Sequence, residues 1–177
     1  RYTEKLHKPV IFLVNQLDAD GCDYDVVVED LQTIYGQKVV PVQYPVKTGA
    51  DFNALIDVIL MKKLTWGPDG GEPTLEDIPA EEKDKAEAMH KALVEAAAEN
   101  DEGLMEKFFE TEHLTEDEMR EGIRKGMITR SIFPVFCVCA SKNMGVGRLM
   151  EFLGNVVPFV DEMPAVHNTR GEEVKPD

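Results

Sequence analysis

The chain has 177 residues, 43% of them hydrophobic, which is enough to bury the core of one domain with an insertion or of two small domains. With 34 Asp and Glu against 19 Lys and Arg, its formal net charge is -15, and such a field repels DNA, RNA and anionic lipid. We therefore expect neither direct DNA binding nor membrane binding, and three cysteines are too few for a disulfide framework, which favours a reducing cytoplasm.

A strand followed by a helix is predicted near the start of the chain. The apolar run Val10–Val14 is typical of a buried strand in a parallel sheet. Asp23 suits the N-cap of a helix that continues to about Ile34 and ends at Gly36. Segment 38–46 contains two prolines, which predicts an extended edge strand.

A helical block is predicted in the middle of the chain. The stretch "GPDGGEP", residues 67–73, is a turn-rich break. A long amphipathic helix is predicted over 80–100, and a second helix over 101–110. Thr115 and Glu118 have the spacing of a capping box that opens a third helix.

The chain then returns to a strand and a helix. Segment 133–140, "FPVFCVCA", predicts another short buried strand, and a helix is expected to start near Val146. Cys137 and Cys139 are interpreted as small core residues, because no second Cys or His pair stands nearby to complete a metal site. Strand and helix, then a helical block, then strand and helix predict an α/β sheet with a subdomain inserted between two of its units.

Two polar side chains, Asn15 and Asp18, follow the first predicted strand. Ligands collect at the carboxyl ends of strands in open α/β sheets. A carboxylate there can accept hydrogen bonds from N1–H and the exocyclic amine of guanine, whereas adenine lacks that amine and is rejected. The Asn amide can bond the O6/N7 edge of guanine. On spacing alone, a capped turn is the alternative interpretation.

The second buried strand ends in a similar way. The stretch "CVCASKNMGVGRL" places small residues and a turn between the strand and the next helix. Small residues allow backbone N–H groups to approach a base oxygen closely. Two strand ends that are far apart in the sequence would then flank one base.

Together these motifs resemble the translational GTPases, and most specifically bacterial elongation factor G. The stretch "KPVIFLVNQLD" resembles the guanine-specificity strand, whose usual motif is Asn-Lys-x-Asp. Residues 65–109 resemble the inserted G′ subdomain, and 133–164 resemble the last strand and helix of the G domain. The order and length of the helical insertion are specific to elongation factor G and its close paralogues.

The resemblance implies a fold and a function. The fold would be a partial P-loop GTPase sheet, which is Rossmann-like, with an inserted α+β G′ subdomain. The parts would be 1–36 with the guanine-specificity motif, 37–130 as G′, 131–160 as the last G-domain strand and helix, and 161–177 as a linker toward the next domain. The whole protein would bind GTP and use its hydrolysis to drive translocation on the ribosome in the cytoplasm.

Residue by residue, the resemblance implies that Asn15, Gln16 and Asp18 contact GTP or GDP through the Asn-Lys-x-Asp motif. Gln16 departs from the family pattern, in which a Lys stem normally lies over the base. Gln has a shorter, uncharged stem, so this departure indicates either weaker nucleotide binding or a divergent paralogue.

The loop after the last strand would supply the other contacts, from Cys139, Ala140, Ser141 and Lys142. In the family, the Ala backbone N–H helps to bind guanine O6. Cys139 stands where Ser is usual, and the Ser hydroxyl often braces this loop.

The phosphate-binding half of a GTPase is not in this sequence. It contains no G-x-x-x-x-G-K-[ST] stretch, and so neither a phosphate cradle nor the Lys that contacts the β- and γ-phosphates. The start at Arg1 and the polar end also indicate a piece of a longer protein. We expect GTP hydrolysis, and the Mg²⁺ that it requires, only in the full-length protein.

The acidic charge is concentrated in residues 80–121, with 15 acidic and 5 basic residues, or -10 of the net -15. This block is either a solvated helix surface or a docking face for a basic partner. In the family, G′ contacts the basic C-terminal domain of the ribosomal stalk protein, and the candidates here are Glu81, Glu82, Asp84 and Glu87. Two other possibilities are a paralogue in ribosome recycling or protection, and a non-enzymatic acidic docking module.

Overall fold

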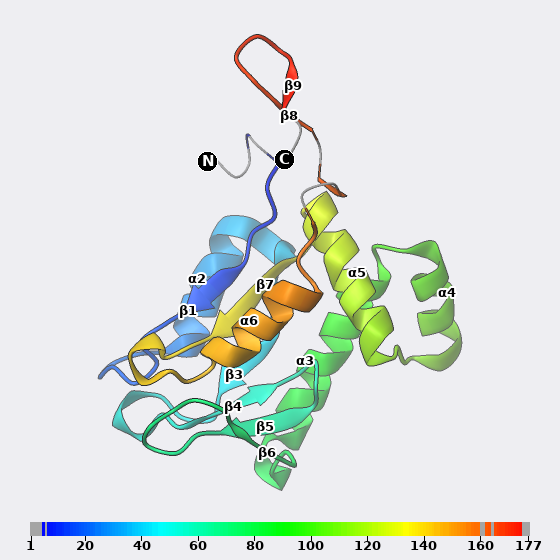
Figure 1. Ribbon diagram of the computed structural model, residues 1–177. Coiled ribbons are helices and arrows are strands. Elements are labelled where there is room, and N and C mark those ends of the chain that lie inside the picture. The colour runs from blue at the N-terminus through cyan, green and yellow to red at the C-terminus, as the bar shows by residue number, and fades with distance from the viewer. Residues whose placement is uncertain (1–4, 6, 160–161, 164, 175–177) are drawn as a thin grey trace.

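The computed structural model describes residues 5, 7–159, 162–163 and 165–174 of the chain (Figure 1). Within these residues the fold is mixed α/β, with one parallel sheet and one larger antiparallel sheet. Helices flank the parallel sheet, and a group of three helices follows the antiparallel sheet in sequence.

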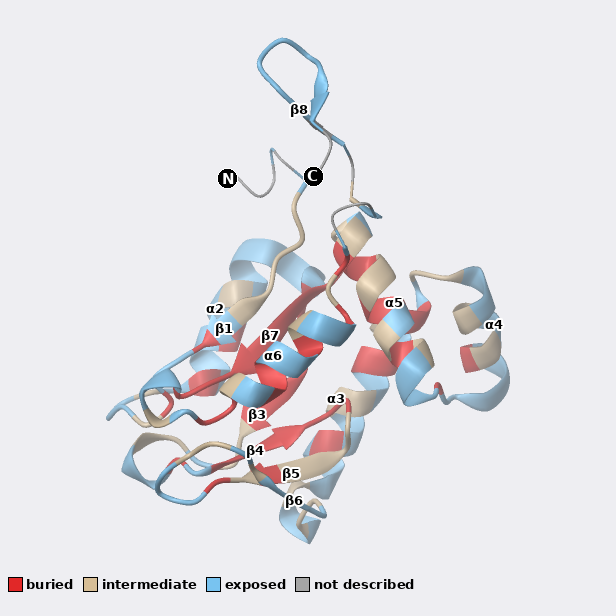
Figure 2. Cartoon of the chain, viewed as in Figure 1, coloured by how far each residue is buried: buried red, intermediate tan, exposed pale blue. Residues whose placement is uncertain are grey.

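Three short strands form the parallel sheet in the order β1–β7–β2. Their bounds are Phe12–Val14 for β1, Val39–Pro41 for β2 and Phe133–Cys137 for β7. The central strand β7 runs parallel to both neighbours and is the last of the three in the sequence. All five of its residues are buried (Figure 2), as expected for a strand between two layers of helix.

Two helices cover opposite faces of this sheet, α2 (Tyr24–Tyr35) and α6 (Val146–Asn155). Phe133 and Phe136 are three residues apart on β7 and therefore point to opposite faces. The ring of Phe133 lies 6.2 Å from that of Tyr35 at the end of α2. The ring of Phe136 lies 4.6 Å from that of Phe152 in α6.

The predicted start and end of α2 are confirmed. The Asp23 carboxylate accepts a hydrogen bond from the Val26 N–H at 3.2 Å, and Gly36 follows the last helical residue with a φ of 76°. Side-chain capping and a left-handed glycine are the two local signals on which that prediction rested.

The antiparallel sheet has four strands in sequence order, β3 (Gln43–Pro45), β4 (Ala54–Asp57), β5 (Lys62–Thr65) and β6 (Thr74–Glu76). Segment 38–46 is predicted from the sequence to be an extended edge strand. The edge position is confirmed, but the segment divides into two strands, β2 and β3, each at the edge of a different sheet. Val42 lies between them, and its N–H donates to the Val135 carbonyl while its carbonyl accepts from the Val58 N–H, both at 3.1 Å. The segment therefore leads the chain from one sheet into the other.

The three helices of the central block are α3 (Ala80–Ala98), α4 (Glu102–Thr111) and α5 (Glu116–Thr129). The predicted capping box is present, with Thr115 and Glu118 each bonding the backbone N–H of the other. Helices α3 and α5 approach each other at Gly122, where a Cβ would lie 2.5 Å from the Ala97 carbonyl oxygen. Glycine at this position therefore allows the two helices to pack closely.

Shorter elements complete the described chain. They are the 3-10 turns η1 (Gly36–Lys38), η2 (Gly49–Asp51) and η3 (Ala140–Lys142), and the hairpin strands β8 (Val166–His167) and β9 (Glu173–Val174). The hairpin lies in the segment 161–177, which is predicted from the sequence to be a linker toward the next domain.

A buried polar network joins the two sheets to α6. Asp57 Oδ2 of β4 accepts hydrogen bonds from Arg148 Nε at 2.8 Å and from Gln43 Nε2 at 2.9 Å. Gln43 Oε1 in turn accepts the Cys137 N–H of β7 at 3.2 Å. Since these side chains are buried, their pairing fixes how the antiparallel sheet sits against the parallel one.

Candidate functional site

The carboxyl ends of β1 and β7 lie side by side, and the polar segments that follow them meet at that edge of the parallel sheet. Val14 is the register partner of Cys137, and the Val138 N–H donates to the Val14 carbonyl at 3.0 Å. Because the strands are parallel, the loop after each strand begins beside the other loop. This edge is the usual position of a ligand site in such a sheet.

Asn15 joins the two loops directly, because its Oδ1 accepts the Ala140 N–H at 3.1 Å across 125 residues of sequence. Gln16 is exposed and has a left-handed backbone with a φ of 61°. Leu17 is fully buried, and its carbonyl accepts the Gly49 N–H at 2.8 Å. This buried anchor sets the positions of the polar residues on either side of it, Asn15 and Asp18.

Asp18 faces the second loop. Its Oδ2 lies 3.2 Å from Lys142 Nζ. A hydrogen bond from the Cys139 thiol, and then one from Lys142, hold the pKa of Asp18 below its ordinary value. The carboxylate is therefore ionised at neutral pH, and in that state it only accepts hydrogen bonds.

A short antiparallel bridge closes the second loop. Cys139 and Met144 exchange two backbone hydrogen bonds, at 2.9 and 3.1 Å, around the turn η3. Cys139 is buried and its Sγ lies 3.4 Å from Ser141 Oγ, so the thiol braces the loop at the position where Ser is usual in the resembled family. Ala140 and Ser141 remain exposed beside it.

Gly145 connects this loop to α6 and was not singled out from the sequence. It has a φ of 80°, and a Cβ at this position would lie 2.4 Å from the Cys137 carbonyl oxygen. A residue with a side chain would therefore displace the loop. The glycine between "KNM" and the following helix is the signal that could have identified it.

A loop of the antiparallel sheet supports the second loop from outside and was also missed. A Cβ at Gly70 would lie 1.8 Å from the Lys142 carbonyl oxygen, and the Gly71 N–H donates to the Asn143 carbonyl at 2.9 Å. Trp66 Nε1 donates to the Gly71 carbonyl at 2.9 Å. The two consecutive glycines could have indicated that backbone approaches backbone here.

The four acidic residues proposed to contact a partner lie on the first two turns of α3, but they do not share one face. Glu81 and Asp84 are three residues apart and lie on the same side of the helix, and both are exposed, as is Glu87. Glu82 is half-buried, and its carbonyl accepts the Tyr44 hydroxyl at 3.3 Å. Asp84 and Glu87 are also three residues apart, so the structure leaves Glu81, Asp84 and Glu87 as an exposed row that one partner could contact together.

The described part of the chain offers no cluster of metal ligands. No group of three or more His, Cys, Asp or Glu side chains there is placed to hold a metal ion. Cys137 and Cys139 are fully buried, in agreement with their interpretation as core residues. Among the helices of those same residues, none is both long and apolar enough to cross a membrane.

Comparison with known proteins finds the same fold within a larger protein. No family model matches the chain. Among solved structures, a protein of Thermus thermophilus is similar, with a TM-score of 0.77 and 28% sequence identity over 88% of this chain. The matching part is 23% of the Thermus protein, so this chain spans less than a quarter of that protein's length.

Proposed function

We propose that this chain is part of a translational GTPase of the elongation factor G type, consisting of the end of its P-loop G domain and the inserted G′ subdomain. The full-length protein would bind GTP or GDP and use GTP hydrolysis to drive translocation on the ribosome, in the cytoplasm. The observation that carries the proposal is the Asn15–Ala140 hydrogen bond, since it joins the two segments that resemble guanine-binding motifs.

The groups at this site complement guanine. Asp18 presents an ionised carboxylate, which can accept both N1–H and the exocyclic amine of the base. The backbone N–H of Ala140 can donate to O6, and the Asn15 amide lies next to it. A base without the amine leaves one carboxylate oxygen unpaired, and this loss is the physical source of selectivity.

Binding of guanine requires an exchange of partners at this site. The Ala140 N–H is bonded to Asn15, and Asp18 is paired with Lys142. Guanine O6 would compete with the Asn15 side chain for the Ala140 N–H, and Lys142 would move away from the Asp18 carboxylate. Both partners are side chains at the surface, so the exchange needs no change in the strands.

The exposed apolar surface next to β1 supports a larger parent protein. Leu13 of β1 is 49% exposed, and Val26 and Ile34 of α2 are 50% and 70% exposed. Parallel sheets are normally covered on both faces and paired along their strands. In the full-length GTPase, the strands and helices of the phosphate-binding half would continue the sheet beyond β1.

In the full-length protein, this chain and the other half of the G domain would have different roles. This chain would recognise the guanine base, whereas the phosphate loop, the Mg²⁺ and the hydrolytic step belong to the other half of the G domain. We assign no catalytic residue to the chain. Because most charge-assisted contacts of a nucleotide are made to its phosphates, the base alone should bind with a Kd of about 1 mM or weaker.

A nucleoside titration of the ¹⁵N-labelled chain tests base recognition. Guanosine should shift the amide resonances of Asn15, Asp18 and Ala140, and adenosine should not. Inosine, which lacks only the exocyclic amine, should bind more weakly than guanosine. Equal shifts with all three nucleosides, or none with guanosine, would count against the proposal.

A substitution at Asp18 tests the role of its carboxylate. In Asp18→Asn, the side-chain amide can donate a hydrogen bond to the group at C2 of the base. That group is an amine in guanosine and a carbonyl, which accepts a hydrogen bond, in xanthosine, so the variant should prefer xanthosine. Asp20→Asn, on the same loop and exposed, is the matched control and should leave the preference unchanged.

The second part of the proposal concerns the ribosome. The basic C-terminal domain of the stalk protein would contact α3 through Glu81, Asp84 and Glu87, with Glu82 at the edge. Charge reversal by Glu81→Lys and Asp84→Lys should abolish binding of that domain in a calorimetric titration. Unchanged affinity would favour one of the alternatives, a paralogue in recycling or protection or an acidic docking module with another partner.

A further inference from the structure

Helix α4 has two different faces, and each follows the helical spacing i, i+3, i+4, i+7. The inner face consists of Leu104, Lys107, Phe108 and Thr111. The outer face consists of Glu102, Met105, Glu106 and Phe109. Phe108 is buried and its neighbour Phe109 is 77% exposed, so α4 turns one aromatic ring to the core and one to solvent.

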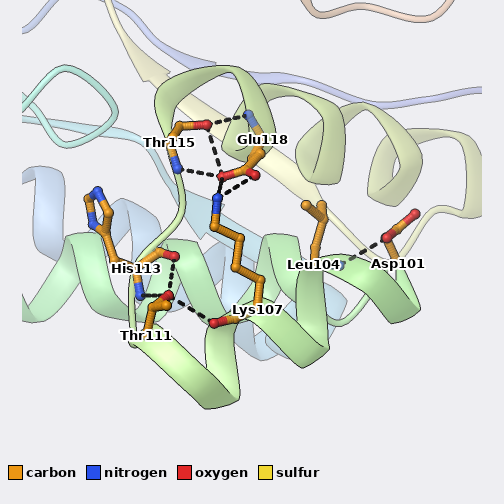
Figure 3. A network of polar contacts seen from close by, with 7 residues as sticks. All are labelled: Asp101, Leu104, Lys107, Thr111, His113, Thr115 and Glu118. Carbon is orange, nitrogen blue, oxygen red and sulfur yellow. Dashed lines mark hydrogen bonds and ion pairs between the residues drawn. The ribbon is translucent and has the colours of Figure 1, made fainter.

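Polar contacts hold the inner face of α4 in place (Figure 3). Lys107 Nζ bonds both carboxylate oxygens of Glu118, at 2.6 and 2.7 Å, and Glu118 is the acidic member of the capping box of α5. At the start of α4, Asp101 caps the Leu104 N–H at 3.0 Å and pairs with Lys125 Nζ at 2.5 Å. Helix α4 is therefore fixed to α5 on one side, and its outer face is presented in one orientation.

The outer face borders a groove of about 330 Å³, which Phe109 and Met105 line together with Glu99, Asp101, Glu102 and Glu106. An exposed Phe beside a partly exposed Met is the kind of apolar centre that binding partners cover in protein interfaces. Carboxylates surround this centre, so the groove combines an apolar floor with an acidic rim.

The charge around the groove is strongly one-sided. Residues 99–112 contain six acidic residues and one basic residue, Lys107, which is turned inward to Glu118; of the six, Asp101 is paired with Lys125 of α5. By contrast, residues 80–87 at the start of α3 contain four acidic and two basic residues. The last turn of α4 carries no basic residue, although basic residues are favoured there by the helix dipole. Glu110 and Glu112 at that end therefore oppose the helix dipole, whereas Asp101 and Glu102 at the start of α4 are favoured by it.

We propose that the outer face of α4 is a docking surface for a basic protein segment, in which an apolar side chain flanked by Lys or Arg covers Phe109. A second copy of this chain would bring the same carboxylates against each other, and nucleic acid or anionic lipid would be repelled. In such a segment, the Lys or Arg side chains pair with the carboxylates at the rim, and the apolar side chain covers the floor of the groove. The surface lies on a different helix from Glu81 and Asp84, and the inference does not depend on guanine binding.

The test is an NMR titration of the ¹⁵N-labelled chain with three synthetic peptides. The first is acetyl-Lys-Lys-Leu-Leu-Lys-Lys-amide. In the second peptide Ser replaces Leu, and in the third Glu replaces Lys. The first peptide should shift amide resonances of residues 99–112, the second should bind about tenfold more weakly, and the third should not bind.

Phe109→Ser should weaken binding of the first peptide about tenfold, because the apolar centre is lost while the charge is kept. Ile34→Ser is the matched control, since Ile34 is 70% exposed on α2, and it should leave the affinity unchanged. Glu102→Lys with Glu106→Lys should abolish binding. Glu81→Lys with Asp84→Lys should not reduce it by more than about twofold, which separates this inference from the α3 contact.

Three outcomes would overturn the inference. The first is equal binding of the Leu and Ser peptides, which would show attraction by charge alone. The second is an unchanged affinity of Phe109→Ser. The third is a dimer in sedimentation that dissociates in Phe109→Ser, since a second copy would then be the occupant of the surface.

Discussion

Gly145 stands before α6 with a left-handed backbone, and the Cys137 carbonyl leaves no room for a side chain there. Gly145→Ala should destabilise the chain by about 2 kcal/mol or more, since it combines the left-handed penalty with a clash. Gly147→Ala is the matched control, because a Cβ there meets nothing within 4 Å and alanine is the better helix former. It should be neutral or stabilise by up to about 1 kcal/mol. Urea denaturation of both variants measures the difference, and equal effects would contradict the account.

The place of Asn15 and Asp18 at a strand end could be predicted, because both follow the recognisable strand β1. Their actual partners could not be predicted in the same way. The bond from Ala140 to Asn15 and the contact of Gly70 with Lys142 join segments far apart in the chain. Such contacts depend on how the two sheets pack, and no local pattern encodes that packing.

Elements with strong local signals were predicted closely. Asp23 and Thr115 mark helix starts by their own side-chain hydrogen bonds, which form within a few residues. The antiparallel sheet gave no such signal. All four residues of β4 are buried and all three of β6 are exposed, so burial alternates along neither strand.

The capping box of α5 should make stability depend on pH. Bonds from Lys107, and then from Thr115, lower the pKa of Glu118 from 4.5 to about 2. Because the pKa of Glu118 is lower in the folded state than in the unfolded state, its ionised carboxylate stabilises the fold when the pH is above 4.5. This contribution is lost as the pH falls from 4.5 to 2. Glu118→Gln should therefore lower Tm at pH 7, and the difference from the native chain should shrink across that window. Glu106→Gln, on the outer face of α4, is the control, and an equal pH dependence in both variants would contradict this role.

Breaking the buried ion pair between β4 and α6 should lower the free energy of unfolding more than breaking an ion pair near the surface. Arg148 and Asp57 are both buried, so Arg148→Met leaves an unpaired carboxylate in the core and should lower the free energy of unfolding by about 3–5 kcal/mol. Adding Asp57→Asn should recover part of this loss. Arg120→Met, which removes partly exposed pairs with Glu116 and Glu151, should cost less than about 1 kcal/mol. Chemical denaturation of the three variants provides the comparison, and additive losses would argue against coupling.

Helix α2 has an exposed apolar surface that no other described residue of the molecule covers. Ile34→Lys should change the free energy of unfolding by less than about 0.5 kcal/mol, because Ile34 is largely exposed. It should also reduce self-association at high protein concentration, as measured by light scattering. Val28→Ala, on the buried side of the same helix, should cost about 1–3 kcal/mol. A large loss of stability in Ile34→Lys would show that this face is already packed.

Trp66 is the one tryptophan of the chain, and its indole N–H is bonded to the loop that supports Lys142 and Asn143. The ring is buried, so its emission depends on the local packing of that loop. A movement of the backbone at Lys142 and Asn143 would reach the indole through Gly70 and Gly71, which lie against their carbonyls. The chain therefore contains an intrinsic fluorophore beside the loop after β7, and its emission spectrum can follow events at that edge of the sheet without any label.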